Sequence, residues 1–204
     1  MPKHVVPVIV GDFKRPDINS FRQFASTISV TSAAEICHIV GVTPEAQSLE
    51  MAVGNKQILH EIDITEEEYE KSVRMIGCED NGAVDYISIG CPHLALDELK
   101  VISEYIGGRK VKGGVELLIW TDYATKEMAD VNGYTEAIEN AGGYLLTGSC
   151  PIVMREESHK HAKAMAMFGA KQAFGIQHQT KVPVYYGDIF QCIDAAISGK
   201  WEGR

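Results

Sequence analysis

Two short segments, Gly90-Cys91-Pro92-His93 and Ser149-Cys150-Pro151, carry the side chains with the clearest chemical potential. Each places a cysteine directly before a proline and close behind an apolar run, at residues 84–89 and 144–147. Such short apolar runs predict buried strands, and proline commonly opens a turn. A thiol in that position lies at the carboxyl end of a sheet, where open α/β folds bind ligands. We therefore expect the two thiols to share one site.

The donor types around these thiols leave two alternatives open, a metal site and a pair of structural thiols in tight turns. Thiolates are soft ligands suited to zinc or iron-sulfur clusters, and His93 adds an imidazole two residues after Cys91. The wide separation of Cys91 and Cys150 excludes the compact spacing of a zinc finger. Two thiols and one imidazole do not complete a set of four ligands.

A second group of polar residues, His38, Thr43 and Glu45, lies in the segment HIVGVTPEA at residues 38–46. His38 is a candidate general base, Thr43 a candidate for holding a substrate carboxylate, and Glu45 a candidate proton-transfer group. Each also has a structural interpretation, because Thr43 is a good helix cap, Pro44 suits the first helical position and Glu45 suits the first turn. Capping and chemistry both fit this segment.

Lys171 and the remaining cysteines complete the chemical inventory. Lys171, in GAKQAF, is a candidate cation for an anionic substrate, and a solvated helix lysine is the alternative. The five cysteines are an odd number, which argues against a disulfide framework, and we expect reduced thiols. Cys78 and Cys192 are expected to be small buried hydrophobic residues.

The order of apolar runs and amphipathic stretches predicts an α/β fold with a mostly parallel sheet and helices on both of its faces. The chain is expected to form one domain over residues 1–204. Strands are predicted at 5–10 (buried), 33–42, 84–89, 115–120, 144–147 and 182–186, the last at an edge because of Pro183. Helices are predicted at 18–29, 45–53, 65–76, 95–106, 126–141, 158–174 and 189–197.

Charge and hydropathy exclude several classes of protein. The formal net charge of -9, without a Lys/Arg cluster, argues against a nucleic-acid surface and favours a small-molecule partner. No apolar run approaches the roughly 20 residues that a membrane helix needs, and Met1-Pro2-Lys3-His4 lacks the pattern of a signal peptide. We expect a cytoplasmic protein without membrane contact.

Four motifs together resemble the aconitase X family: HIVGVTPEA (38–46), IGCPHLALDEL (89–99), SCPI (149–152) and GAKQAF (169–174). The resemblance covers almost the whole chain and corresponds to roughly the carboxyl-terminal half of that family's catalytic subunit. It implies an aconitase-like catalytic domain in an iron-sulfur hydro-lyase that dehydrates a small hydroxy acid of the cis-3-hydroxyproline or mevalonate 5-phosphate class.

The resemblance also implies roles for individual residues. It makes Cys91 and Cys150 ligands of an iron-sulfur cluster, [2Fe-2S] or [4Fe-4S]. His38, Glu45 and His93 are expected to be catalytic, and Thr43 and Lys171 to bind substrate. The expected partners are a swivel-domain small subunit and a complementary amino-terminal catalytic portion.

One departure from the family pattern supports an alternative function. The family's His-Ile-Asp-x-Cys type motif, which looks like the source of a third ligand, has no match here, and Cys37 is a candidate substitute that points to the opposite strand face from His38. A non-catalytic ligand-binding or partner-binding domain without the cluster is therefore the alternative.

Overall fold

The computed structural model describes residues 5–77, 81–154 and 159–203, so Cys78 lies outside the described residues. The contacts between Cα atoms divide the chain into two compact units, Met1–Tyr69 and Glu70–Arg204, where the sequence predicts one domain. The physical reason is that the first unit contributes its own small sheet and does not extend the large one. Each unit is described by itself.

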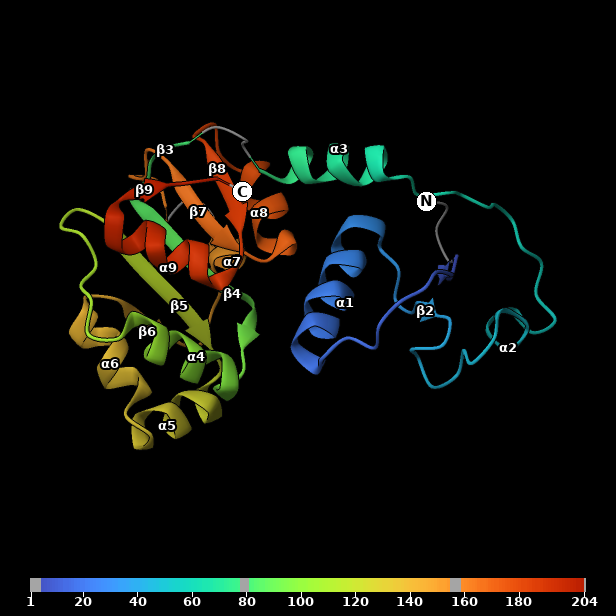
Figure 1. Ribbon diagram of the computed structural model, residues 1–204, viewed down its shortest axis with the longest axis horizontal. Helices are drawn as coiled ribbons and strands as arrows, with labels where there is room; N and C mark the ends of the chain where they lie inside the picture. Colours follow the sequence, from blue (N-terminus) through green and yellow to red (C-terminus); the bar gives the residue numbers. More distant parts are fainter. Residues whose placement is uncertain (1–4, 78–80, 155–158, 204) are drawn as a thin grey trace. The chain divides into compact units, whose positions relative to one another are not determined.

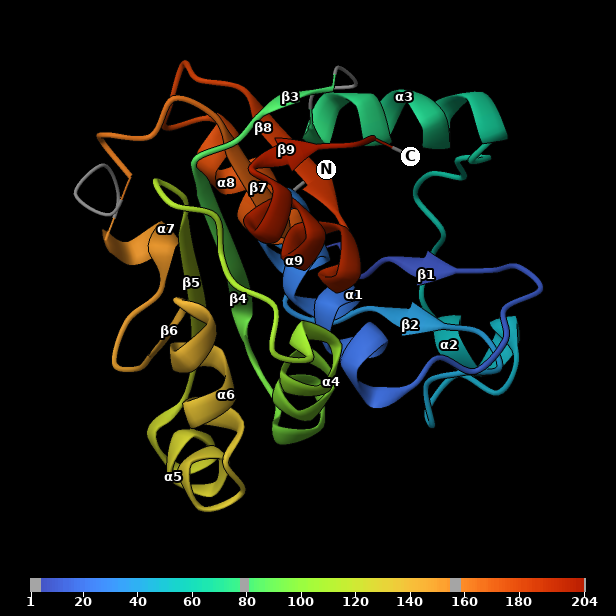
Figure 2. The ribbon, with the colours of Figure 1, turned by 60° about the vertical axis from the view of Figure 1, so that its left-hand side comes forward.

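The larger unit is built on a five-stranded, wholly parallel sheet (Figure 1). Its strand order is β6-β5-β4-β7-β8, with β4 in the centre and β8 at an edge. The views of Figure 1 and Figure 2 both show β4 and β5 side by side. The strands are β4 (Tyr86–Leu94), β5 (Glu116–Thr121), β6 (Tyr144–Leu146), β7 (Met165–Phe168) and β8 (Val184–Gly187).

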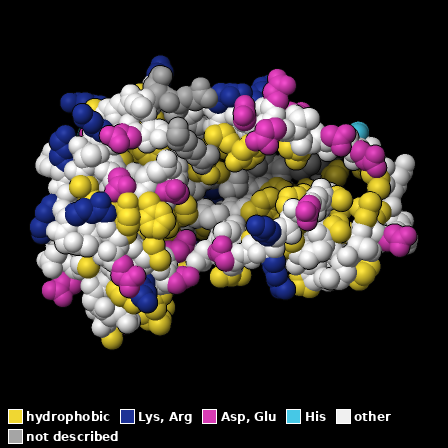
Figure 3. Space-filling view, in the orientation of Figure 1, with side chains coloured by type: hydrophobic (Ala, Val, Ile, Leu, Met, Phe, Trp, Pro, Cys, Tyr) yellow, Lys and Arg dark blue, Asp and Glu magenta, His cyan; other side chains and the backbone are white. Residues whose placement is uncertain are grey.

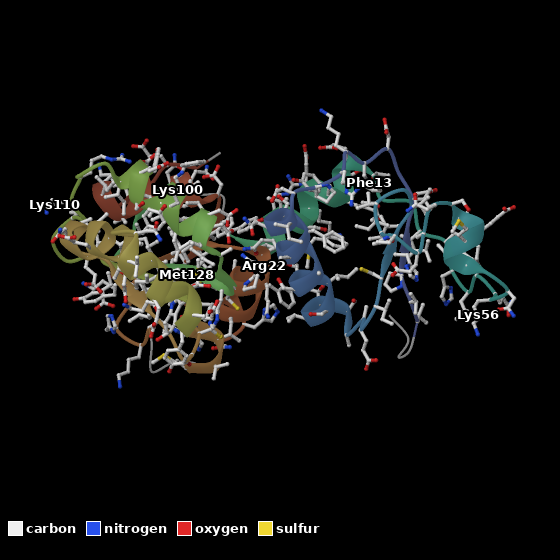
Figure 4. All side chains as sticks on the ribbon, turned by 90° about the horizontal axis from the view of Figure 1, so that it is seen from below. Phe13, Arg22, Lys56, Lys100, Lys110 and Met128 are labelled. Atoms are coloured by element: carbon white, nitrogen blue, oxygen red, sulfur yellow. The ribbon has the colours of Figure 1, made fainter. Side chains whose placement is uncertain are left out.

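Helices cover both faces of this sheet, which confirms the predicted fold class. One face packs against α4 (Leu96–Ile106), α6 (Tyr134–Ala141) and α9 (Ile189–Ser198), with α5 (Tyr123–Val131) beside them. The other face packs against α7 (Pro151–Met154) and α8 (Ala170–Gln177). Lys100 of α4 and Met128 of α5 are exposed on the outer surface (Figure 4). Parallel sheets need this double cover because both of their faces are apolar.

A small antiparallel pair lies outside the main sheet. It joins β3 (Gly82–Ala83) to β9 (Lys200–Trp201), so the segment after the last helix forms a short strand. The Trp201 ring stacks on Tyr185 at a centroid distance of 5.7 Å and is 3% exposed, which places this segment in the core.

Two predicted helices of the larger unit are wrong in outline. The helix expected at 126–141 is divided into α5 and α6, because Gly133 adopts a φ of 77° that ends the first helix. The helix expected at 158–174 is a strand, β7, followed by α8. The run MAMF has helical composition, and its burial beside the central strand β4 overrides that propensity.

The smaller unit contains α1 (Ile18–Ser32), α2 (Leu49–Val53) and one parallel pair, β1 (Val8–Ile9) with β2 (His38–Ile39). Helix α3 (Glu66–Ile76) crosses the boundary between the units. The strand predicted as buried at 5–10 is wrong in extent and burial, since Val6 and Val10 are 47% and 61% exposed. The predicted strand at 33–42 is likewise reduced to β2, because only two residues find a strand partner.

Cap residues explain where the helices of the smaller unit begin. Asp17 accepts hydrogen bonds from the backbone of Asn19 and Ser20 and starts α1. Ser48 caps α2, so this helix begins later than the predicted residue 45. Thr65 and Glu68 form the reciprocal bonds of a capping box at α3. Phe13, in the loop before α1, is half exposed (Figure 4).

The close approach of β4 and β5 at Gly90 yields a stability prediction. Gly90 has a φ of 119°, and a Cβ built there would lie 2.9 Å from the backbone nitrogen of Trp120. Gly90→Ala is therefore expected to lower the free energy of unfolding by at least about 3 kcal/mol, through left-handed strain and overpacking. Denaturant unfolding monitored by Trp fluorescence measures the loss.

Gly113→Ala is the matched control, because nothing lies within 4 Å of a Cβ at that position. It should change the free energy of unfolding by less than about 0.5 kcal/mol. Equal midpoints for the two variants would contradict the packing argument.

Candidate functional site

Cys91 lies at the carboxyl end of the central strand, in the part of β4 where pairing with β5 changes register. The side chain is 3% exposed. Two buried polar groups brace the strand just before it, because the indole Nε1 of Trp120 donates to Ser88 Oγ at 3.2 Å and the amide Nε2 of Gln172 donates to the Ser88 carbonyl at 3.2 Å. The thiol is therefore held on a rigid element.

Cys150 lies in the loop after β6, immediately before α7. The Cys150 carbonyl accepts hydrogen bonds from the backbone of Val153 and Met154, so the cysteine begins this short helix. Nε2 of His93 lies 2.8 Å from the carbonyl oxygen of Ser149. This contact joins the loop that follows β6 to the end of β4.

The two thiols lie close enough to interact. Cys150 and the charge of Lys171 both act on the pKa of the Cys91 thiol. Burial raises the pKa of Cys91 to about 11; the Lys171 charge opposes this rise, whereas Cys150 adds to it. The structure thus brings together Cys91, Cys150, His93 and Lys171, which we call the thiol cluster.

Lys171 and Gln172 lie in the first turn of α8, and Lys171 belongs to the thiol cluster. Gly169 precedes this helix without a side-chain cap, so its first backbone N–H groups are not used by a capping side chain. Lys171 is half-buried and Gln172 is fully buried. Ser88, Trp120 and Gln172 were not identified from the sequence, although a serine inside the apolar run VDYISI is the kind of signal that marks a buried polar network.

The other predicted residues, His38, Thr43 and Glu45, belong to the smaller unit. Thr43 is 7% exposed, and its hydroxyl accepts from the Ile39 N–H at 3.1 Å and donates to the Ile39 carbonyl at 3.2 Å. It does not cap a helix, since residues 40–47 form turns. His38 is half-buried, and its Nδ1 has no hydrogen-bond partner among the described residues. Glu45 is exposed.

The donor atoms of the thiol cluster fit part of a soft-metal site. Cys91 and Cys150 supply two adjacent sulfur donors, the type preferred by iron-sulfur clusters. Within residues 5–77, 81–154 and 159–203, no cluster of three or more His, Cys, Asp or Glu side chains is arranged to hold a metal ion. Cys192, in the core, is fully buried, as predicted, and burial raises the pKa of its thiol.

The Thr43 hydroxyl provides a local test of the smaller unit. Thr43→Val removes both bonds to Ile39, and we expect amide hydrogen exchange at Ile39 to accelerate roughly fivefold, equivalent to about 1 kcal/mol. Thr43→Ser keeps the hydroxyl and should retain most of the protection. Unchanged exchange at Ile39 in the valine variant would show that the hydroxyl does not order this loop.

Each of the two units matches a family model. Residues 2–74 match the aconitase X second domain, and residues 84–198 match the aconitase X third domain. These ranges correspond closely to the two compact units of the structure.

Two dehydratases are similar to this chain in sequence, in agreement with the family matches. The chain is 30% identical to a cis-3-hydroxy-L-proline dehydratase of Hypocrea jecorina over 98% of this chain and 34% of that protein. It is 28% identical to the phosphomevalonate dehydratase large subunit of Methanocaldococcus jannaschii over 92% of this chain and 45% of that protein. The chain thus spans between a third and a half of the length of these relatives.

A solved structure extends the likeness to the fold. The crystal structure of Thermococcus kodakaraensis aconitase X in its holo-form superposes with a TM-score of 0.77 at 26% identity, covering 94% of this chain and 47% of that chain. Taken with the two family-model matches, this agreement in sequence and fold shows that the chain belongs to the aconitase X family.

Proposed function

We propose that this chain is part of an aconitase X-type iron-sulfur hydro-lyase that dehydrates a small hydroxy acid. The observation that carries the proposal is the convergence of the Cys91 and Cys150 segments at the carboxyl edge of a parallel sheet, where Nε2 of His93 lies 2.8 Å from the carbonyl oxygen of Ser149. The relatives named as dehydratases of cis-3-hydroxy-L-proline and phosphomevalonate support the reaction class and the two candidate substrate classes.

Cys91 and Cys150 would hold the cluster. When bound, a cluster of this kind supplies a Lewis acid for the leaving hydroxyl group. Lys171 stands on the first turn of α8, where its own charge and the N-terminal end of the helix dipole both favour an anion. We therefore assign Lys171 to the carboxylate or phosphate of the substrate.

The smaller unit would supply proton transfer. His38 and Glu45 are the candidate bases for the proton next to the substrate carboxyl group, as the sequence predicts. Thr43 serves this part of the site by ordering the loop between them through Ile39.

His93, the third predicted catalytic residue, belongs to the larger unit. Its Nε2 lies in hydrogen-bond contact with the carbonyl oxygen of Ser149, so Nδ1 is the ring nitrogen left for proton transfer.

Metal content tests the proposal. Anaerobically purified chain is expected to contain iron and acid-labile sulfide, and Cys91→Ser or Cys150→Ser should each remove most of both, because either change deletes a sulfur donor. Cys192→Ala is the matched control, since Cys192 is a core residue and its variant should retain iron. Cys37→Ser examines the candidate third ligand in the same assay.

Two outcomes of the metal assay oppose the proposal. Full iron content in the Cys91 and Cys150 variants would refute the ligand assignment. Zinc or no metal in the unmodified chain, also after co-expression with its partner, would favour the non-catalytic binding domain.

The partner chains are also proposals. We infer a complementary amino-terminal catalytic portion and a swivel-domain small subunit, because the chain spans less than half of the length of the relatives described above. Exposed apolar side chains of the smaller unit support a docking surface for the first of these, and Figure 3 shows hydrophobic side chains on its surface. Ile62 and Ile64 are 76% and 77% exposed in a segment without regular structure.

A charge substitution tests this docking surface. Ile62→Lys with Ile64→Lys should leave the thermal midpoint of the isolated chain unchanged and weaken co-purification with the amino-terminal portion at least roughly tenfold, because buried unpaired charge opposes association. Val131→Lys on α5, 89% exposed in the other unit, is the control. Undiminished co-purification of the double variant would place the interface elsewhere.

No helix of the described residues is both long and apolar enough to cross a membrane. The cytoplasmic location expected from the sequence stays a prediction.

A further inference from the structure

The contact between His93 and Ser149 has a defined direction. A carbonyl oxygen only accepts hydrogen bonds, so Nε2 of His93 must carry the hydrogen that points at Ser149, 2.8 Å away. In the neutral ring this leaves Nδ1 as the unprotonated nitrogen. The imidazole therefore donates through one nitrogen and retains a lone pair on the other.

The position of this bond in the sheet gives it a special role. Cys91 is on β4 and Cys150 follows β6, and β5 lies between these two strands. Strands two places apart are separated by roughly 9.5 Å, so the sheet does not by itself bring the thiols together. His93 follows Cys91 by two residues, and Ser149 directly precedes Cys150. The hydrogen bond thus ties the two thiol-bearing segments across the end of β5.

We propose that His93 is a positioning residue whose Nε2–H holds the Ser149-Cys150 segment against Cys91, so that the two thiols are presented as a preorganised pair. We call this hydrogen bond the clasp. Its importance for the reaction rests on the proposed function, whereas its geometry does not. The test therefore uses the full chain without metal and needs neither cluster nor substrate.

Two amide substitutions separate the clasp from proton transfer by the other nitrogen. The side-chain amide of glutamine reaches about as far as Nε2 of histidine, whereas that of asparagine reaches about as far as Nδ1. His93→Gln can therefore keep the bond to Ser149 and loses the Nδ1 lone pair. His93→Asn loses the bond. A clasp predicts rescue by glutamine and not by asparagine.

Phenylarsine oxide is a suitable probe of thiol proximity. Each arsenic forms two As–S bonds with a dithiol while its oxygen and the two thiol protons leave as water, with no change of oxidation state. Cys150 is half-buried and is expected to react first, and the nearly buried Cys91 closes the ring. The closed adduct resists an excess of monothiol and is removed by a dithiol such as 2,3-dimercaptopropanol.

The experiment measures the fraction of chain in the monothiol-resistant adduct over time, with peptide mass spectrometry to identify the bridged cysteines. The unmodified chain and His93→Gln are expected to form the Cys91–Cys150 adduct at similar rates. In His93→Asn, the bridged adduct is expected to form at least roughly fivefold more slowly, because one hydrogen bond is lost. Cys91→Ser and Cys150→Ser should give no bridged adduct.

A core variant controls for general destabilisation. Ile138→Val shortens a fully buried side chain of α6, an element that contributes no residue to the thiol cluster. Its thermal midpoint can be compared with that of His93→Asn. The clasp predicts that Ile138→Val closes the adduct at the unmodified rate. Equal closure in His93→Asn and the unmodified chain, or equal slowing in the glutamine and asparagine variants, would overturn the proposal. Neither result would alter the iron and sulfide measurement, which tests the function separately.

Discussion

The parallel pairing of β4 with both of its neighbours is the constraint on which the rest of the larger unit depends. Tyr86 is aligned with Glu116 on β5 and with Met165 on β7, so the strands end at one edge of the sheet. The end of β4 and the segments that follow β6 and β7 lie at this edge and carry Cys91, Cys150 and Lys171. Helix cover on both faces excludes water from the strands and leaves that edge for chemistry.

Buried hydrogen bonds between polar groups stabilise β4 just before the same edge of the sheet. Ser88 accepts from Trp120 through its hydroxyl and from Gln172 through its carbonyl, which links β5, β4 and α8 a few residues before Cys91. Such satisfied networks specify one arrangement of a core more sharply than apolar packing alone. Burial also raises the pKa of the Cys91 thiol to about 11.

The smaller unit has a different physical character. Of the fifteen residues of α1, all described, none is fully buried, and the unit's only parallel pair among the described residues joins strands of two residues each. A two-stranded sheet contributes little stability by itself. This unit, which matches the aconitase X second domain, exposes several large apolar side chains.

Local sequence patterns determined the elements whose signals agree with their surroundings. The strands predicted at 84–89 and 115–120 became β4 and β5, and the helices predicted at 95–106 and 189–197 became α4 and α9. Periodicity, caps and glycine stops favoured the same state in these elements. The parallel sheet with helices on both faces follows from their alternation. The motifs around His38, Cys91, Cys150 and Lys171 were sufficient to indicate the aconitase X family.

Tertiary structure decided what depends on neighbours distant in the chain. MAMF is a strand because β4 and β8 pair with it, and the segment from Val131 to Tyr134 is a break because Gly133 takes a left-handed φ. The sequence predicted that Cys91 and Cys150 share an edge, but it did not show that β5 separates their strands or that His93 binds Ser149 across it. Spacing along the chain carries no information on strand order, and strand order sets which side chains meet.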